Sequence, residues 1–194
     1  MEISSTQLKE LRDATGISVM QCKRALEEAG GDMEKALIIL RKKSGEAASK
    51  KSDRAFGAGA VGAYAHNTHD VAALVLLSCE TDFVSKNEDF IALSRDIAMQ
   101  VVATSPKYIS REEISEAERA KAAEVFAEEV KDKPADLREK ILEGKLDAYF
   151  KEQVLLDQAF IKDQDRTIAN LVHDAIQKFG ENIAIQKISR VSVK

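Results

Sequence analysis

The residues that could do chemistry include a glycine run that matches a nucleotide-binding pattern. Gly57, Gly59 and Gly62 spell GxGxxG, and Glu80 follows further along the chain. This pattern binds dinucleotides when a strand precedes it and a crossover helix follows it. Here a charged segment precedes, and the eight residues between Gly62 and Val71 are fewer than the roughly ten to twelve that a crossover needs. We expect a flexible glycine hinge, with a dinucleotide-dependent reductase as the enzyme alternative.

A second group of side chains carries atoms that bind metals. Its members are His66, His69, Asp70, Cys79 and Glu80. The first three fall in a predicted turn and the last two at the far end of the strand that follows. That strand separates the two sets by about 25 Å, too far for one ion. We therefore expect ordinary turn residues and no metal site.

His173 is the remaining candidate for acid–base chemistry. It follows Val172 on a predicted helix, and no nucleophile can be paired with it. A single helical histidine without partners more often has a structural role. We expect no catalytic residues and no cofactor, and this favours a binding protein over an enzyme.

One segment indicates a contact with another molecule. Residues 78–85 read SCETDFVS and join a buried strand to a helix that Ser85 and Glu88 are predicted to cap. An aromatic ring beside a carboxylate on such a connection, here Phe83 beside Asp82, is well placed to project outward. The alternative is that Val84 and its neighbours pack into the core. The residue types alone support both interpretations equally.

The elements that must position these residues begin with three short helices in residues 1–45. Each predicted helix starts at a capping side chain and ends at glycine or at a change of composition. The caps are Ser4, Ser18 and Asp32. Each helix has one apolar stripe, so the sequence predicts a small three-helix module.

A basic segment, RKKSGEAASKKSDR, follows this module. A charge run of this kind is usually solvated, and we expect a tether over residues 46–56. Residues 57–194 then form the predicted core domain. Residues 60–79 read as a β-hairpin whose second strand, Val71 to Cys79, is apolar enough to be buried on both faces.

Helices are predicted for the middle of the core domain. They cover about 85–105, 110–130, 134–155 with a possible break at Gly144, and 167–179. The alternating apolar residues of 183–193 predict a closing strand beside the hairpin. The result is an α+β fold in which an antiparallel sheet of about three strands packs against helices.

Composition excludes several classes of protein. The 194 residues are 44% hydrophobic with a net charge of −4, which favours a folded chain and disfavours binding to nucleic acid. The start lacks a signal-like pattern and no apolar run is long enough to cross a membrane. We expect a soluble cytoplasmic protein with two free, buried cysteines, Cys22 and Cys79.

Three blocks of this sequence resemble the elongation factor Ts family. They are LRDATGISVMQCKRALEEAGGDMEKAL, CETDFVSKNEDFIALSRDIAMQVVATSPKYISREE and EGKLDAYFKEQVLLDQAFIKD. The resemblance implies a guanine-nucleotide exchange factor whose partner is elongation factor Tu. It also implies an N-terminal helical module like a ubiquitin-associated domain.

The resemblance further implies two contacts with that partner. In the family, one loop enters the nucleotide-binding domain of elongation factor Tu near its magnesium ion. This loop corresponds to residues 80–85 here, and its contact residues would be Thr81, Asp82, Phe83 and Val84. Phe83 would then be the wedge and Asp82 the neighbouring acid.

The helical module would make the second contact through Arg12, Val19 and Met20. Val19 stands where the family often has methionine, and Gln21 where an acid is common. The chain resembles a short form without the second core subdomain and the coiled coil, which implies a homodimer formed through the core. A rival hypothesis is an adaptor whose helical module binds ubiquitin-like or ribosomal partners.

Overall fold

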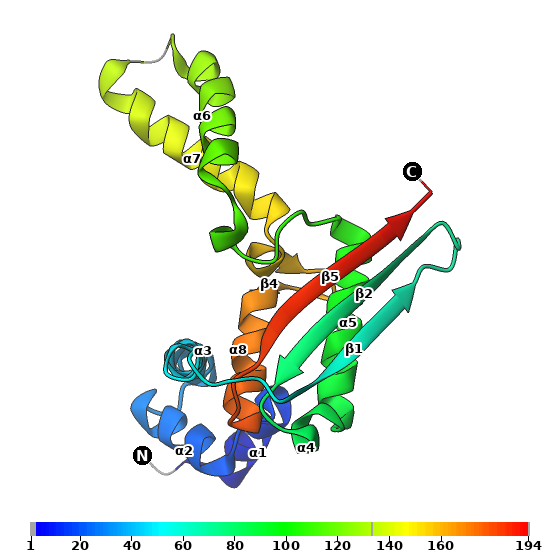
Figure 1. Cartoon of the computed structure of the whole chain (residues 1–194). Coiled ribbons are helices and arrows are strands. Elements are labelled where there is room, and N and C mark those ends of the chain that lie inside the picture. The colour runs from blue at the N-terminus through cyan, green and yellow to red at the C-terminus, as the bar shows by residue number, and fades with distance from the viewer. Residues whose placement is uncertain (1–2, 133, 194) are drawn as a thin grey trace.

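The computed structural model describes residues 3–132 and 134–193. Over these residues the chain forms a three-stranded antiparallel sheet with helices on one face (Figure 1). The predicted α+β class and the small antiparallel sheet are therefore confirmed.

The N-terminal helices are α1 (Ser5–Thr15), α2 (Val19–Glu28) and α3 (Met33–Ser49). All three predicted caps are confirmed, because each side chain accepts a hydrogen bond from a backbone N–H of its helix. The buried apolar side chains of this module are Leu11, Ile17, Cys22, Ala25, Leu26, Ala36 and Leu40. They form a small core separate from the main one.

Helix α3 continues through the first part of the segment predicted as a tether. It ends at Ser49, and it packs against α8 (Ile168–Phe179). Ser44 is buried and its hydroxyl donates to Gln177, while Ala48 packs against the main core. Between the basic residues of α3, small side chains such as Ser44 and Ala48 form a stripe that lets α3 pack closely against α8. The tether prediction is wrong at residues 46–49, and only 50–57 connect α3 to the sheet.

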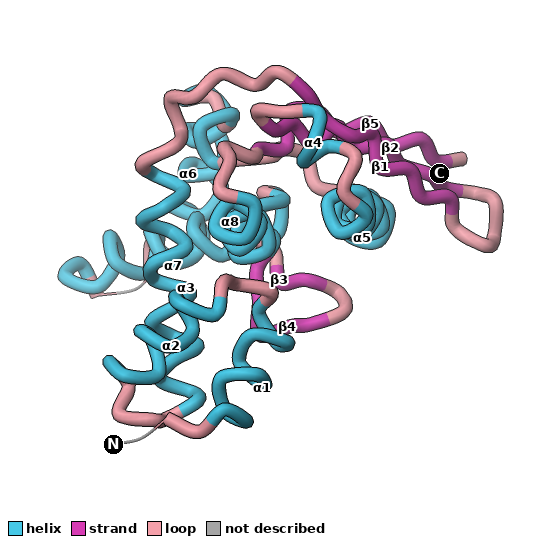
Figure 2. The backbone as a smooth tube through the Cα atoms, turned by 90° about the horizontal axis from the view of Figure 1, so that it is seen from below, coloured by secondary structure: helices cyan, strands magenta, loops and turns pink. Residues whose placement is uncertain are grey.

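The sheet has the order β1-β2-β5, antiparallel throughout. Strands β1 (Ala58–Ala65) and β2 (Val71–Cys79) form the hairpin, and β5 (Ala184–Ser192) pairs with β2. The hairpin and the closing strand are present as predicted. Helices α5 (Glu88–Thr104) and α8 cover one face, and no helix of the described residues covers the other (Figure 2).

Strand β2 is buried on both faces only at its end, over residues 77–79, which corrects the prediction of burial on both faces along the whole strand. Val75 and Leu77 are fully buried, whereas Leu74 is 51% and Leu76 36% exposed. Because side chains alternate along a strand, the exposed pair points to the open face. The continuous apolar sequence of β2 therefore did not mean that both faces of this strand are covered by other elements throughout.

A bulge in β5 explains a second difference. Leu76 pairs with Lys187 but Leu77 pairs with Ile185, so Gln186 is the extra residue. One extra residue reverses which side chains face the core. Ile185 is buried as expected, but Val191 is 71% exposed on the open face.

Gly59 and Gly62 of the glycine run lie in β1, so the hinge prediction is wrong for these two residues. A Cβ at Gly62 would lie 2.1 Å from the carbonyl oxygen of Ser94 on α5. Glycine is needed there because the helix crosses the strand at backbone contact distance. The run precedes an antiparallel partner strand, not a crossover helix, so the dinucleotide interpretation has no structural basis.

Helices α6 (Glu116–Val130) and α7 (Ala135–Gln153) form a hairpin that projects from the core (Figure 1). A short 3-10 helix, Arg111–Glu113, leads into it, and another, Leu155–Asp157, follows it. Helix α7 passes through Gly144 without the suggested break.

Two short strands, β3 (Ala159–Phe160) and β4 (Asp163–Thr167), were not predicted. They pair with each other before α8 begins. No helix among the described residues is both long and apolar enough to span a membrane.

Candidate functional site

The connection after β2 forms a short helical turn, α4 (Asp82–Ser85), which presents one aromatic side chain to solvent. Phe83 is 84% exposed, whereas the next residue, Val84, is 3% exposed and belongs to the main core. Consecutive residues of a helical turn point about 100° apart, so one can anchor the turn while the other projects. Val84 was predicted to contact a partner, but in this structure its burial makes it the anchor of the turn.

The capping prediction for the following helix is wrong. Asn87 is the N-cap of α5, because its side chain accepts from the N–H of Asp89 at 2.9 Å. The Ser85 hydroxyl instead donates to the Asp82 carbonyl within α4, at 3.1 Å. Residues 82–104 therefore form two helices, and the break at Asn87 separates the exposed turn from the long helix.

Asp82 lies beside Phe83 and carries a negative charge in the free protein. Its carboxylate accepts from the Lys86 ammonium at 2.7 Å, and both side chains are about three-quarters exposed, at 75% and 76%. The hydrogen bond from Lys86, followed by the attraction of its charge, holds the pKa of Asp82 below its usual value. A partner would meet an ionised carboxylate beside an apolar ring.

Cys79 closes the strand just before this turn. It is buried, and its thiol donates to the Thr81 carbonyl at 3.2 Å. Burial, with the nearby charge of Glu181, raises the pKa of the thiol. Cys22 is also free and buried, as predicted. Cys79 is thus a packing residue that remains protonated.

The other predicted contact residues surround the turn between α1 and α2. Arg12 is exposed, as are Val19 at 43% and Met20 at 60%. Gly16 ends α1 with a left-handed φ of 66°, and Ser18 caps α2. Two large apolar side chains are therefore open to solvent on a rigid, capped helix start.

The N-terminal module and the Phe83 turn lie toward the same end of the molecule, opposite the α6–α7 hairpin (Figure 1). A Cβ at Gly16 would lie 3.4 Å from the Lys178 side chain, and the ammonium of Lys178 pairs with Asp89 at 2.7 Å. The Lys178 side chain therefore lies near the α1–α2 turn and pairs with the first turn of α5, just after the exposed ring.

The remaining candidates do not form a reactive site. His66 and Asp70 are linked through the Thr68 hydroxyl in the hairpin turn. Cys79 pairs with Ala58 at the opposite end of the hairpin, and the described residues contain no cluster of metal ligands. The half-buried His173 faces α3 near Gly45, and burial lowers its pKa.

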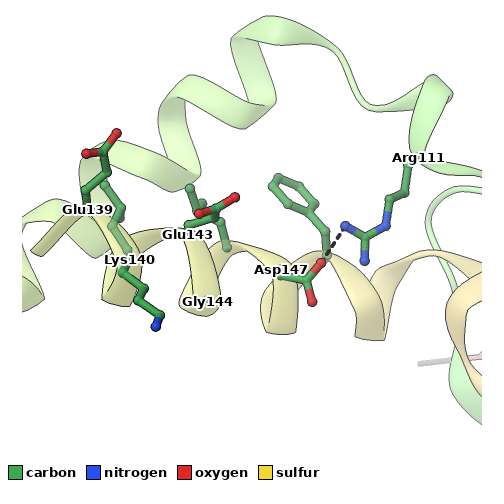
Figure 3. A pocket seen from close by; sticks show the side chains of 9 residues that line it. Arg111, Glu139, Lys140, Glu143, Gly144 and Asp147 are labelled. Carbon is green, nitrogen blue, oxygen red and sulfur yellow. Dashed lines mark ion pairs between the residues drawn. The ribbon is translucent and has the colours of Figure 1, made fainter. Parts of the chain in front are cut away.

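A hollow along α7 is lined by several charged residues (Figure 3). One of them holds the α6–α7 hairpin in place. Arg111 pairs with Asp147 of α7 at 2.6 Å and also with Asp157. These contacts raise the pKa of Arg111, with Asp157 as the larger cause. The arginine therefore ties the hairpin to the core.

Residues outside the exposed turn also hold it in place, and they were not predicted from the sequence. The carboxylate of Glu181 accepts from the backbone of residues 80 and 81, about one hundred residues away in the chain. The only local signal was the helix-ending Gly180 just before it. No sequence spacing relates Glu181 to residues 80 and 81, so this contact can be found only from the three-dimensional structure.

The fold and the site define an α+β protein that presents an exposed, well-anchored aromatic turn, a feature suited to contact with another macromolecule. The family model described as Elongation factor TS matches residues 6–193. Elongation factor Ts of Leptospira biflexa is 47% identical over 195 residues, covering 100% of this chain and 98% of that protein. Elongation factor Ts of Fervidobacterium nodosum is 44% identical over 195 residues, covering 100% and 99%.

A longer relative agrees with these two. Elongation factor Ts of Desulforamulus reducens is 44% identical over 191 residues, covering 97% of this chain and 88% of that protein. The chain therefore belongs to the elongation factor Ts family.

Proposed function

We propose that this chain is a cytoplasmic guanine-nucleotide exchange factor that binds elongation factor Tu and promotes the release of GDP. The observation that carries the proposal is the Phe83 ring, 84% exposed on a turn that Val84 anchors in the core. Phe83 is the most exposed large apolar side chain among the described residues, and aromatic side chains are enriched at protein interfaces. Membership of the elongation factor Ts family supports the same partner.

The proposed action is a wedge at the magnesium site of the partner. Magnesium requires nearly ideal octahedral geometry at about 2.0 to 2.1 Å, so a small displacement of its protein ligands weakens its binding. GDP is held through that ion and through backbone N–H groups of a phosphate-binding loop. A phenyl ring inserted beside them disturbs both sets of contacts, and the Asp82 charge disfavours the return of the phosphates.

The exchange itself needs no reaction by this chain. If the factor weakens GDP binding by a given ratio, GDP weakens the binding of the factor by the same ratio. The complex is therefore transient while nucleotide is bound, and excess GTP completes the cycle. This is why the proposal assigns no catalytic residue and no cofactor to the chain.

The N-terminal module supplies the second proposed contact, through Arg12, Val19 and Met20. Met20 and Val19 are exposed large apolar residues on the same capped helix start. A module of this shape, which we compare with a ubiquitin-associated domain, would grip the same domain of the partner from another side. The packing of α3 against α8 would keep the two contacts at a fixed separation.

We further propose that two copies associate through the open face of the sheet. Val61 pairs with Leu76, and Leu74 and Val191 lie on the same face. All four are exposed, at 63%, 36%, 51% and 71%. A second copy of the same apolar face would cover these side chains, and the sheets would pack about 10 Å apart.

The test of the proposed function is the release of labelled GDP from elongation factor Tu. Wild type should accelerate release, and Phe83→Ala should reduce that acceleration at least roughly tenfold, with a smaller loss for Asp82→Ala. Val125→Ala is the matched control, because this side chain is also exposed, at 62%, but lies on the distant α6. No acceleration by wild type would contradict the proposal.

A further inference from the structure

The carboxylate of Glu181 makes three hydrogen bonds to the entrance of the Phe83 turn. It accepts from the N–H of Glu80 and from the N–H of Thr81, both at 3.0 Å, and from the Thr81 hydroxyl at 2.5 Å. Glu181 follows Gly180, whose φ of 75° ends α8. The backbone reversal at this glycine directs the next residue toward the end of β2.

The contact is reciprocal. The Glu80 carboxylate accepts from the N–H of Asn182 at 2.6 Å and pairs with Arg54 at 3.2 Å. These partners, Asn182 first, hold the pKa of Glu80 below its usual value. The 4% exposed Asn182 side chain donates to the carbonyl oxygens of Ser52 and Arg54, at 3.3 and 2.8 Å.

Three segments therefore meet at this point: the chain leaving α3, the chain leaving β2 and the connection between α8 and β5. Hydrogen bonds to an ionised group are about twice as strong as those between neutral groups. Glu181 supplies three of them at the position where the β2 ladder has ended and α4 has not begun. Thr81, the N-cap of α4, makes no capping bond with its own side chain.

Helix α4 has four residues, too few to be stable without external support. Val84 fixes one side of the turn in the core, and the Cys79 thiol donates to the Thr81 carbonyl. The Glu181 carboxylate adds three hydrogen bonds to the segment that leads into the turn, the nearest of them two residues before Phe83. Together these attachments determine the direction in which the ring leaves the surface.

We infer that Glu181 is a positioning residue that pre-orients the Phe83 turn for elongation factor Tu. This inference rests on the proposed function and adds a residue to its site. Glu181 touches no nucleotide and acts through the backbone of residues 80 and 81. Without it, the turn occupies its binding-competent orientation for a smaller fraction of the time. The apparent affinity for the partner falls by that fraction, whereas the step that follows binding keeps its rate.

Two variants separate the hydrogen bonds from the charge. Glu181→Ala removes all three bonds. Glu181→Gln keeps an oxygen for the two N–H groups and places an amide donor beside the Thr81 hydroxyl. Asp96→Ala is the matched control, since it also removes a partly exposed carboxylate from a close contact, the 2.6 Å pair with Lys162.

The first measurement is amide hydrogen exchange in the free full-length protein. Glu181→Ala should accelerate exchange at the N–H groups of Glu80 and Thr81 at least about tenfold. Glu181→Gln should stay within about threefold of wild type at both positions, and Asp96→Ala should leave them unchanged. Equal protection in wild type and Glu181→Ala would overturn the inference.

The second measurement is GDP release as a function of factor concentration, at a temperature where all variants are folded. Glu181→Ala should raise the half-saturating concentration roughly tenfold and leave the maximal rate within about twofold. Glu181→Gln should recover most of the loss. If Glu181 had a purely structural role, its loss would lower thermal stability without raising the half-saturating concentration at a constant maximal rate. An unchanged half-saturating concentration would refute the positioning role.

The proposed function and the inference about Glu181 are contradicted by different results. If wild type does not accelerate GDP release, the proposed function fails. The hydrogen-exchange result then still decides whether Glu181 holds the turn. If Phe83→Ala slows release and Glu181→Ala leaves the half-saturating concentration unchanged, only the positioning inference fails.

Discussion

At the scale of single residues, neighbours on α4 have opposite roles. Phe83 is 84% exposed and Val84 is 3% exposed, although both are large apolar side chains in one turn of helix. Residue type could not predict which of them packs in the core, because both interpretations require an apolar side chain there. The difference depends on how β2 and α5 position the turn.

Phe83→Ala and Val84→Ala should therefore differ in stability. Truncation of an exposed ring should change the free energy of unfolding by less than about 0.5 kcal/mol. Truncation of the buried valine should lower it by about 1 to 3 kcal/mol through lost contacts and a cavity. Urea denaturation of both variants measures the difference, and a large loss for Phe83→Ala would show that the ring packs in the folded protein.

The Asp82–Lys86 pair makes a prediction about pH. Because Lys86 lowers the pKa of Asp82, the contact stabilises the turn above the usual carboxyl pKa. That contribution is lost as the pH falls through the lowered value. NMR titration should give Asp82 a pKa below the usual value of an aspartate side chain, and Lys86→Ala should raise it. If the pKa is the same in both proteins, the pair does not persist in solution.

At the scale of elements, the caps and periodicities were the most reliable signals. Ser4, Ser18 and Asp32 cap their helices as predicted because capping is a local contact between neighbours in sequence. Asn87 was missed because Ser85 fits the same pattern. The choice between them depends on α4, which is too short to leave a periodic signal.

The predictions that failed concern contacts between distant elements. The α3 segment after Arg41 reads as solvated charge, yet Ser44 packs against α8. The bulge at Gln186 cannot be inferred from β5 alone, since it is a property of the pairing with β2. The hydrogen bonds of Glu181 to residues 80 and 81 belong to the same category.

Two glycines test the packing of elements. Gly62→Ala should destabilise the protein by about 1 to 3 kcal/mol, because the new methyl group meets the backbone of α5. Gly144→Ala is the control: it lies within α7 with open space around it and should stabilise by about 0.5 to 1 kcal/mol. Thermal unfolding of both variants measures this, and equal effects would contradict the close crossing of α5 over β1.

At the scale of the whole molecule, the proposed dimer would cover the open face of the sheet, whereas the Phe83 turn belongs to the connection between β2 and α5. The proposal therefore assigns the two contacts to different elements. The helices on the opposite face would remain outside the contact (Figure 2).

Leu74→Asp should separate such a dimer. It places a charge among Val61, Leu76 and Val191 on the open face, where burial of an unpaired carboxylate is costly. Sedimentation should show wild type as a dimer and Leu74→Asp as a folded monomer at micromolar concentration. Glu116→Ala, a change on the distant α6, should leave the dimer intact, and a monomeric wild type would eliminate the dimer.

We propose that the exposed ring at position 83 acts on the exchange step itself. The most direct measurement is stopped-flow release of labelled GDP from elongation factor Tu at saturating factor, with wild type and Phe83→Ala. We predict a maximal rate at least roughly tenfold lower for Phe83→Ala, because the variant still binds but lacks the wedge. Equal maximal rates, with only the half-saturating concentration changed, would contradict the account and reduce Phe83 to a binding contact.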